Sequence, residues 1–412
     1  MRVTWLSVSD QLGGSEVALL EMVRAIRLLR PEWDLQVVVP GDGPLGDRVT
    51  AAGASCAVVP LPAALARIGE SAAIRRRWSV ASRAALGLRL CAGAAASPGY
   101  ERRLRDVVSG FHPDVIHTNG LKAHIFAARL RLPGCAIVWH VHEYLDRRRL
   151  TRLLMRKYAP RCSAVVANSA SVAKDVRAAL GGSPAANVVY NTVDLDAFAP
   201  QGARLDLDVL AEWPAPPEGV VRVGLIATFG RWKGHDVFLR ALSQVPPAMA
   251  VRGYIVGGPV YDTTGSQTTR AELEAQVDAL GLRGRVGFTG FVEPGAAMRS
   301  LDVVVHASSE PEPFGLVVAE AMSCGRPVIT TGHGGVAEII EPGENVLVAP
   351  PGDDAALAAA ICRLAENPAL RQRLGVRARA TALTRFERER MAADLVRIYE
   401  SVRSRGPEAR PA

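Results

Sequence analysis

The sequence predicts an α/β protein with two doubly wound, parallel-sheet domains of the Rossmann-like kind. Short apolar runs rich in β-branched residues alternate with longer segments of helical periodicity, as in parallel sheets that helices cover on both faces. With 412 residues, 49% of them hydrophobic, the chain is long for one domain and sufficient for two cores. We therefore expect a first domain over residues 1–200, a linker over 201–219 and a second domain over 220–382.

The first domain is expected to open with a strand, a glycine loop and a helix. Arg2–Val8 is strand-like, Asp10–Glu16 includes Gly14, and apolar residues recur with helical spacing from Val17 onwards. Ser15 and Glu16 suit the N-cap and first turn of that helix. A glycine loop that joins a parallel strand to a helix can accept an anion, although this loop is not the G-x-G-x-x-G of dinucleotide sites. Further strands are expected at 35–39, 56–61, 114–117, 135–141 and 164–169.

Two histidines, His140 and His142, stand at the carboxyl end of the strand expected at 135–141. Ligands of open α/β sheets bind at this end of the strands, so a histidine there can reach a ligand. The two-residue period of a strand places both side chains on the same face.

Two basic segments belong to the first domain. Residues 63–105 are rich in alanine and carry Arg75-Arg-Arg-Trp78, and residues 147–161 place Arg152, Arg156 and Lys157 at helical spacing. Residues 1–200 hold 26 Lys and Arg against 16 Asp and Glu, so the net charge of +8 lies in this half. The basic helices either dock on an anionic membrane surface or form a solvated helical insertion, and the sequence leaves both interpretations open.

The second domain is expected to begin with a strand at Val221–Ala227, which leads to two cations, Arg231 and Lys233. Residues 199–219 before it are rich in proline and have few apolar runs, which is typical of a linker. Further strands are expected at 254–258 and 285–291, and a final amphipathic helix at 383–402, followed by a frayed tail at 406–412.

Residues 310–328 form the most informative stretch. A buried strand, Leu301–His306, is expected before it, and a helix over Leu316–Cys324 is expected to end at Gly325. Gly315 allows close backbone approach, and the first helical N–H groups make a site for a phosphate. Glu312 precedes the helix and Glu320 lies on its second turn, so the two carboxylates must address different parts of one ligand. A sugar joined to a nucleoside through a diphosphate suits this pattern.

The run Glu312-Pro-Phe-Gly-Leu-Val-Val-Ala-Glu320-Ala-Met, with Gly325-Arg-Pro-Val328 behind it, resembles the E-x7-E motif of retaining glycosyltransferases of family 4, which have the GT-B fold. The Gly-Gly loop before Glu16, the Lys233-Gly234 pair and the loop at 332–335 resemble other motifs of that family. The resemblance is loose over 1–200 and close over 220–380. It implies two Rossmann-like domains that face each other across a cleft, with the helix at 383–402 packed back on the first domain.

The resemblance also implies the reaction: retaining transfer of a hexose-type sugar from a nucleotide-diphospho sugar to an unidentified acceptor, which is a polysaccharide, a glycolipid or a natural product. Glu320 would bind the ribose hydroxyls and Glu312 the hydroxyls of the sugar. His142, which continues as His-Glu in the manner of the family, would orient the sugar, with His140 as the second choice; His142 and Glu312 are the candidate catalytic residues. The remaining donor-site residues implied are Gly14, Arg231, Lys233, Phe314, Gly315, Leu316 and Val317, of which the last six would hold the diphosphate.

No metal or cofactor is expected, because no Asp-x-Asp motif stands at a suitable strand end and the cations and helix N-terminus can take its place. The six cysteines are scattered, which suits a reducing compartment, and no run is long enough for a signal peptide or a membrane span. We therefore expect a cytoplasmic or membrane-peripheral protein. The alternatives are a sugar-nucleotide epimerase of the same fold and a non-catalytic sugar-nucleotide-binding subunit; nucleic-acid binding is supported by net charge alone.

Overall fold

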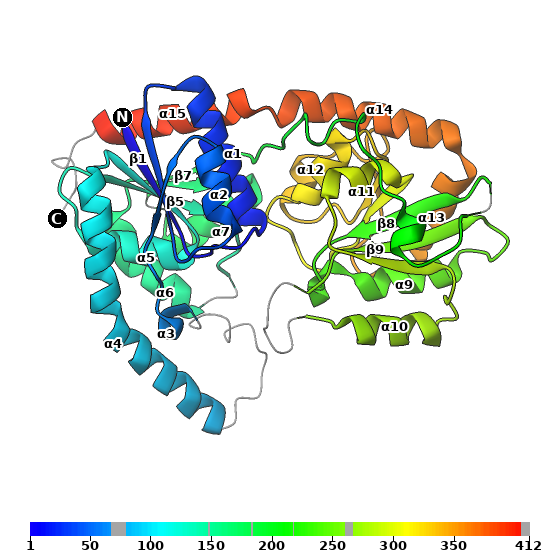
Figure 1. Cartoon of the computed structure of the whole chain (residues 1–412), viewed down its shortest axis with the longest axis horizontal. Coiled ribbons are helices and arrows are strands. Elements are labelled where there is room, and N and C mark those ends of the chain that lie inside the picture. The colour runs from blue at the N-terminus through cyan, green and yellow to red at the C-terminus, as the bar shows by residue number, and fades with distance from the viewer. Residues whose placement is uncertain (67–79, 147–148, 183, 217, 260–266, 405–412) are drawn as a thin grey trace. The chain divides into compact units, whose positions relative to one another are not determined.

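A computed structural model describes residues 1–66, 80–146, 149–182, 184–216, 218–259 and 267–404 (Figure 1). The chain divides into two compact units. The first unit contains Met1–Thr192 and the C-terminal segment from Arg388, and the second unit contains Val193–Glu387. Each unit is built on its own parallel sheet.

The first unit has a seven-stranded sheet in the order β3-β2-β1-β4-β5-β6-β7, and all of its strand pairs are parallel. The order reverses between β1 and β4, so the carboxyl ends of these two strands flank the point where open α/β sheets bind ligands. The strands are β1 (Arg2–Ser7), β2 (Asp34–Val39), β3 (Ser55–Val58), β4 (Val115–Asn119), β5 (Ala136–Val141), β6 (Ala164–Ala167) and β7 (Ala186–Val188). All five further strands predicted for this half, and the first strand, are confirmed.

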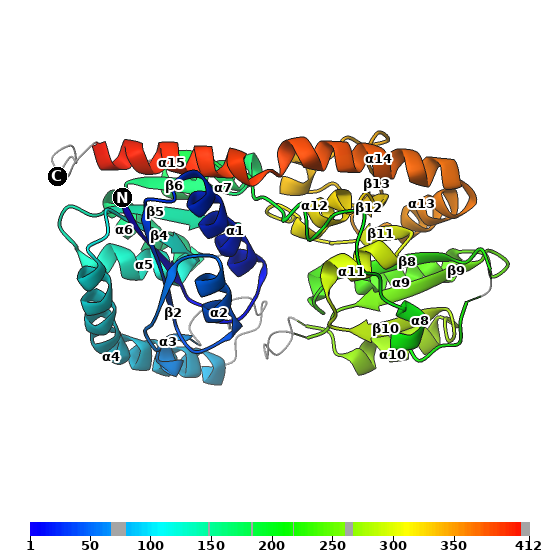
Figure 2. The ribbon, with the colours of Figure 1, turned by 45° about the horizontal axis from the view of Figure 1, so that its top comes forward.

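Helices cover both faces of this sheet (Figures 1 and 2). Alternation along β1 explains the two layers: Val3 and Trp5 belong to an apolar cluster with α1 and α15, whereas Leu6 belongs to a second cluster with α5 and α7. The helices of the first unit are α1 (Gly14–Leu29), α2 (Pro44–Ala51), α3 (Ala63–Ala66), α4 (Val80–Phe111), α5 (Leu121–Leu130), α6 (Arg149–Tyr158), a short 3-10 turn (Ala159–Arg161), α7 (Ala170–Leu180) and α15 (Arg388–Ser404).

The second unit has a six-stranded parallel sheet in the order β10-β9-β8-β11-β12-β13. Its strands are β8 (Val221–Ile226), β9 (Val251–Val256), β10 (Val286–Gly290), β11 (Val303–His306), β12 (Val328–Thr330) and β13 (Leu347–Val348). Its helices are α8 (Leu207–Leu210), a 3-10 turn (Arg231–Lys233), α9 (His235–Gln244), α10 (Arg270–Ala279), α11 (Pro294–Ser300), α12 (Leu316–Ser323), a 3-10 turn (Gly335–Glu338), α13 (Asp354–Glu366) and α14 (Pro368–Arg385). Here too the order reverses between the first strand of the unit, β8, and β11.

Local sequence chemistry explains where several helices begin. Ser169 caps α7 as predicted, because its hydroxyl accepts a hydrogen bond from the N–H of Val172. Thr269 and Glu272 form a reciprocal capping box at the start of α10. The prediction that Ser15 caps α1 is wrong: the N-cap is Gly13, and the Ser15 hydroxyl instead donates to the carboxylate of Glu16 over 2.9 Å.

The segment predicted as a linker, residues 201–219, is packed into the second unit. Asp208 on α8 is buried and accepts hydrogen bonds from Arg222 on β8, over 2.9 Å, and from the hydroxyl of Tyr254 on β9, over 2.6 Å. It also pairs with Arg252. One buried carboxylate with three donors therefore holds this proline-rich segment against the sheet, and the first unit ends at Thr192 instead of residue 200.

The helix predicted over 383–402 is two helices, α14 and α15, which Phe386 and Glu387 separate. Phe386 is fully buried and contacts Phe314 edge to face at a centroid distance of 6.0 Å, so the chain turns its side chain into the second unit before it continues. Helix α15 packs along α1 in the first unit (Figure 2). Within the described part of the chain, no helix has the length and apolar character that crossing a bilayer requires.

Candidate functional site

The N-terminus of α12 has the form that the sequence predicted. Gly315 is the N-cap with a φ of +85°, a left-handed conformation that glycine adopts without strain. The N–H of Val318 makes the first bond of the helix, to the carbonyl of Gly315 over 3.0 Å. The N–H groups of Gly315, Leu316 and Val317 precede that bond, and these are the groups that an anion at a helix N-terminus would take.

Glu312 is the centre of a polar cluster just before α12. Its Oε1 lies 2.6 Å from Nζ of Lys233, accepts a hydrogen bond from the Ser308 hydroxyl over 2.5 Å, and lies 3.2 Å from Nε2 of His306. His306 is held in turn by Thr330, whose hydroxyl lies 3.0 Å from its Nδ1. Burial would raise the pKa of Glu312, but Lys233 and His306 outweigh it and hold that pKa well below its usual range. The carboxyl group is therefore ionised.

A glycine places Lys233 beside this cluster. Gly234 follows it with a φ of +75°, and a Cβ there would lie only 2.0 Å from the carbonyl oxygen of Ala307. The N–H of Ser309 also donates to the carbonyl of Trp232 over 2.8 Å. The Lys-Gly turn after β8 therefore packs directly against the end of β11, and the residue after the lysine must be glycine because a side chain would collide with the Ala307 carbonyl.

Arg231, predicted as a second phosphate ligand, makes a different contact. Its guanidinium lies 3.1 Å from the carboxylate of Glu272 on α10, and both side chains are about half exposed. An exposed pair of this kind contributes little to stability and can be exchanged for another anion. The structure therefore brings Lys233 to Glu312 but leaves Arg231 at Glu272.

Glu320 lies on the second turn of α12 and is half-buried. Burial, and then the charge of nearby Glu293, raise the pKa of Glu320 to about 7. Among the described residues, no group donates a hydrogen bond to its carboxyl group. A partly buried carboxyl group without a partner is poised to accept hydrogen bonds from a ligand.

The glycine loop after β12 runs beside Glu312. The backbone N–H of Glu312 donates to the carbonyl of His333 over 3.4 Å, and the N–H of Gly335 donates to the carbonyl of Glu312 over 2.7 Å. This loop and the Glu312 segment are therefore held in register, while the His333 side chain is exposed.

In the first unit, His142 follows the carboxyl end of β5. Its Nε2 lies 2.6 Å from Oδ1 of Asn119 at the end of β4, and the Asn119 amide nitrogen donates to the carbonyl of Ser15 over 3.0 Å. The predicted common face of His140 and His142 is confirmed, because their rings stack with centroids 3.9 Å apart. Burial lowers the pKa of His142 to about 4, so its imidazole is neutral near pH 7.

The sequence placed Gly14 and His142 in this unit but gave no role to Asn119, which joins the first turn of α1 to the histidine. Gly14 is the first residue of α1, adjacent to the Ser15 carbonyl that Asn119 contacts. The available signal was position: Asn119 ends the strand that neighbours β5, as the pairing of Asn119 with His140 shows.

The basic segments are only partly described. Arg75-Arg-Arg-Trp78, Arg147 and Arg148 lie outside the described residues. Arg156 on α6 donates to backbone carbonyls at the end of α7, and Arg161 in the 3-10 turn after α6 donates to the carbonyl of Ala128 on α5 over 3.2 Å. These two cations therefore satisfy helix ends. The exposed residues of α6 include Leu150, Leu153 and Leu154, which are exposed to 63, 59 and 45%, together with Arg156 and Lys157.

Both parts of the chain match glycosyltransferase families. Residues 214–381 match the family "Glycosyl transferases group 1", and residues 12–197 match "Glycosyltransferase Family 4". A lipopolysaccharide core biosynthesis glycosyltransferase, LpsD of Rhizobium meliloti, is 31% identical over 214 residues, which cover 48% of this chain and 59% of that protein. A phosphatidyl-myo-inositol mannosyltransferase of Mycobacterium leprae is 33% identical over 200 residues, 47% of this chain and 51% of that protein. The chain thus spans between half and three fifths of these two relatives.

Among solved structures, HepE of Anabaena in complex with UDP has a TM-score of 0.75 and 24% identity, covering 97% of this chain and 100% of that one. Its complex with UDP-glucose gives a TM-score of 0.72 and 25% identity, covering 98% of this chain and 100% of that one. The fold class predicted from the sequence, with two Rossmann-like parallel-sheet domains of the GT-B kind, is confirmed.

Proposed function

We propose that this chain, whose two halves are glycosyltransferase domains, transfers a hexose-type sugar from a nucleotide-diphospho sugar to an acceptor hydroxyl and retains the configuration of the anomeric carbon. The observation that carries the proposal is the set of groups around α12. An ionised carboxylate at Glu312, an ammonium at Lys233 and the N-terminus of α12 come from two neighbouring loops at one edge of the sheet. The carboxyl group of Glu320, to which no described residue donates a hydrogen bond, lies on the second turn of α12.

Each group suits one part of such a donor. Glu312 is ionised and can only accept hydrogen bonds, as the hydroxyls of a sugar require. Lys233 and the N–H groups of Phe314, Gly315, Leu316 and Val317 supply the positive potential that a diphosphate needs. Glu320 can accept hydrogen bonds from two adjacent ribose hydroxyls. Arg231 would join the diphosphate by exchanging Glu272 for a phosphate oxygen.

The transfer itself needs one bond to break and one to form. The bond between the anomeric carbon and the diphosphate oxygen breaks, and the acceptor oxygen bonds to the same face of that carbon. The proton of the acceptor hydroxyl passes to the departing diphosphate, so that a nucleoside diphosphate is released. The cation and helix N-terminus stabilise the charge that develops on the leaving group. His142 would orient the sugar hydroxyls near the reaction centre.

We also propose that transfer needs no divalent metal, since Lys233 and the α12 N-terminus can neutralise the leaving group. The test is a transfer assay in which the enzyme has been dialysed against EDTA. Activity that is lost with EDTA and restored by Mg²⁺ or Mn²⁺ would contradict this part of the proposal.

The complexes of HepE with UDP and UDP-glucose support a uridine donor as the first to test. The relatives, a lipopolysaccharide core biosynthesis glycosyltransferase and a phosphatidyl-myo-inositol mannosyltransferase, support a sugar-containing or lipid-linked acceptor. A lipid-linked acceptor would bring the chain to a membrane, and the exposed leucines of α6 with Lys157 beside them suit contact with an anionic surface. Sedimentation with vesicles of anionic and of neutral lipid, comparing wild type with Leu153→Glu, tests this contact.

The proposed activity is tested by incubating the protein with a nucleotide-sugar and sugar acceptors and measuring release of the nucleoside diphosphate. We expect Glu312→Gln to lower the rate at least a hundredfold, because it removes the ionised acceptor. Glu310→Gln, an exposed glutamate two residues earlier in the same loop, is the matched control and should retain activity. A product with the inverted anomeric configuration would refute retention, and an epimerised nucleotide-sugar without diphosphate release would favour an epimerase.

A further inference from the structure

A buried hydrogen-bonded chain lies behind His142 in the first unit. The hydroxyl of Tyr399 on α15 lies 2.8 Å from Nδ1 of His117 on β4, and Nε2 of His117 lies 3.1 Å from Nδ1 of His140 on β5. His140 then stacks on His142. The Tyr399, His117 and His140 side chains are fully buried, and so is Asn119 on the opposite side of His142.

Asn119 determines which nitrogen of His142 carries the proton. The carbonyl of Ser15 can only accept a hydrogen bond, so the Asn119 group that faces it must be the amide NH₂. The Asn119 oxygen therefore faces His142, and because that oxygen can only accept, Nε2 of His142 must donate. Nδ1 of the same ring is then an acceptor. A backbone carbonyl in the first turn of α1 thus fixes, through Asn119, the tautomer of the histidine that follows β5.

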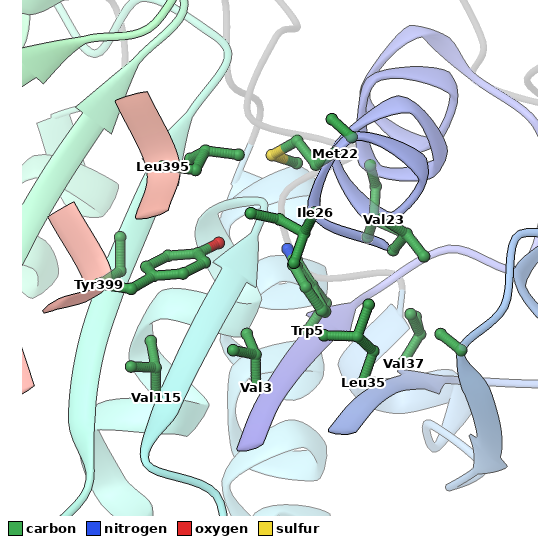
Figure 3. Close-up of a cluster of buried hydrophobic side chains, with 14 of the residues drawn as sticks. Val3, Trp5, Met22, Val23, Ile26, Leu35, Val37, Val115, Leu395 and Tyr399 are labelled. Carbon is green, nitrogen blue, oxygen red and sulfur yellow. The ribbon is translucent and has the colours of Figure 1, made fainter. Parts of the chain in front are cut away.

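The Tyr399 chain fixes the ring against which His142 stacks. Each of its two hydrogen bonds needs one hydrogen, so the tautomers of His117 and His140 must match each other and the orientation of the Tyr399 hydroxyl. Tyr399 reaches into the core from α15 toward Trp5 and Val3 (Figure 3). It packs on the Trp5 ring at 6.4 Å and on the His117 ring at 5.8 Å. Burying these three polar side chains costs free energy that apolar residues would not cost. A role in orienting the neighbouring ring accounts for that cost.

We propose that Asn119, His117, His140 and Tyr399 are positioning residues that hold His142 in the tautomer with its proton on Nε2, so that Nδ1 accepts a hydrogen bond from a hydroxyl of the bound sugar. Asn119 acts by direct hydrogen bonding, and the Tyr399 chain acts by holding the His140 ring under His142. The tautomer follows from the hydrogen bonds of Asn119 alone, whereas the use made of Nδ1 rests on the proposed function.

The tautomer is measurable without any substrate. Two-bond ¹H–¹⁵N correlation spectra of the full chain labelled with [¹⁵N]histidine distinguish a protonated from an unprotonated ring nitrogen, and His142→Ala assigns the signals. We expect wild-type His142 to be protonated on Nε2 alone. Asn119→Ala removes the acceptor that faces Nε2 and should give a mixture of the two tautomers.

Tyr399→Phe removes one buried hydroxyl from the chain, and Tyr100→Phe is its matched control because Tyr100 is also a buried tyrosine of the first unit but lies outside this network. Tyr399→Phe should change the His117 and His140 signals and broaden those of His142, whereas Tyr100→Phe should leave all three unchanged. In the transfer assay we expect Asn119→Ala to lower kcat at least tenfold and Tyr399→Phe about fivefold, with less than a twofold change in the KM for the donor.

A wild-type His142 protonated on Nδ1, or a tautomer that Asn119→Ala and Tyr399→Phe both leave unchanged, would overturn the positioning role. The wild-type spectrum decides the tautomer even if a variant does not fold. If the spectra change as expected but no nucleotide-sugar is consumed, the proposed function fails while the positioning network stands. If the spectra change and donor turnover occurs with unaltered kcat in both variants, Nδ1 is not used and the proposal is refuted.

Discussion

Replacement of Gly315 by alanine tests how the N-terminus of α12 is built. Gly315 has a φ of +85°, and a Cβ added there would lie 2.5 Å from Cγ2 of Val336. Gly343 offers a matched control, because its φ is +84° and a Cβ there would meet no atom within 4 Å. Both substitutions carry the cost of a left-handed alanine, about 1–2 kcal/mol, but only Gly315→Ala adds a steric conflict of about 1–3 kcal/mol.

We therefore expect Gly343→Ala to lower the free energy of unfolding by about 1–2 kcal/mol and Gly315→Ala by about 2–5 kcal/mol, measured by urea denaturation. The variant Val336→Ala removes the conflicting methyl group. In a double-mutant cycle, Gly315→Ala with Val336→Ala should cost about 1–3 kcal/mol less than the sum of the two single variants. Gly315→Ala should also weaken nucleotide binding at least tenfold, because the helix N–H groups move.

Equal destabilisation by Gly315→Ala and Gly343→Ala, with an additive double variant, would refute the close approach of Gly315 and Val336. An unchanged nucleotide affinity in Gly315→Ala would refute the use of this helix N-terminus for the diphosphate. The two readouts are independent, so the packing argument and the binding argument can fail separately.

Three further predictions concern charge and burial. Lys233→Met removes the first charge that lowers the pKa of Glu312, so that pKa should rise and the acid limb of the transfer rate should move to higher pH than in wild type; an unmoved limb would show that Lys233 does not set this pKa. Burial lowers the pKa of His117 to about 3 and that of His142 to about 4, whereas both histidines have a pKa of about 6.5 in the unfolded chain. The free energy of unfolding should therefore fall as the pH drops from about 6.5 to 4, by about 1.4 kcal/mol per pH unit for each histidine. Denaturation curves at pH 7, 6 and 5 test this, and a stability that does not change over that range would contradict it. Asp208→Ala leaves Arg222, Arg252 and Tyr254 without their shared acceptor and should lower the free energy of unfolding by about 2–4 kcal/mol. The control is Asp206→Ala, which removes an exposed helix-capping carboxylate on the same segment and should lower it by about 1 kcal/mol.

Much of the fold could be predicted from the sequence because the strands are apolar and the helices between them are periodic. The strand at β11, the glycine at 315 and the helix after it follow from local chemistry, since an αL glycine, a buried strand and a helix end each leave a sequence pattern. The pair of Lys233 with Glu312 follows from topology, because both loops leave the same edge of the sheet.

What could not be predicted depends on contacts between distant segments. The linker prediction failed because composition alone cannot show that Asp208 finds Arg222 and Arg252. The role of Asn119 required the pairing of β4 with β5, and that of Tyr399 required knowledge of which core α15 enters. The pKa of Glu320 depends on how deeply its turn of α12 is buried.

The most direct test of the account is the affinity of UDP-, GDP-, ADP- and TDP-sugars for the wild type, Glu320→Gln and Glu344→Gln, measured by calorimetry at pH 6 and pH 8. Glu320, with a pKa of about 7, should bind the ribose in its ionised form, so affinity for the preferred nucleotide should be several-fold higher at pH 8 than at pH 6. Glu344, an exposed glutamate of the same unit, is the control. We expect one nucleotide to bind the wild type and Glu344→Gln with this pH dependence, and Glu320→Gln to bind at least tenfold more weakly with none. No binding of any nucleotide-sugar, or equal binding by Glu320→Gln, would contradict the account.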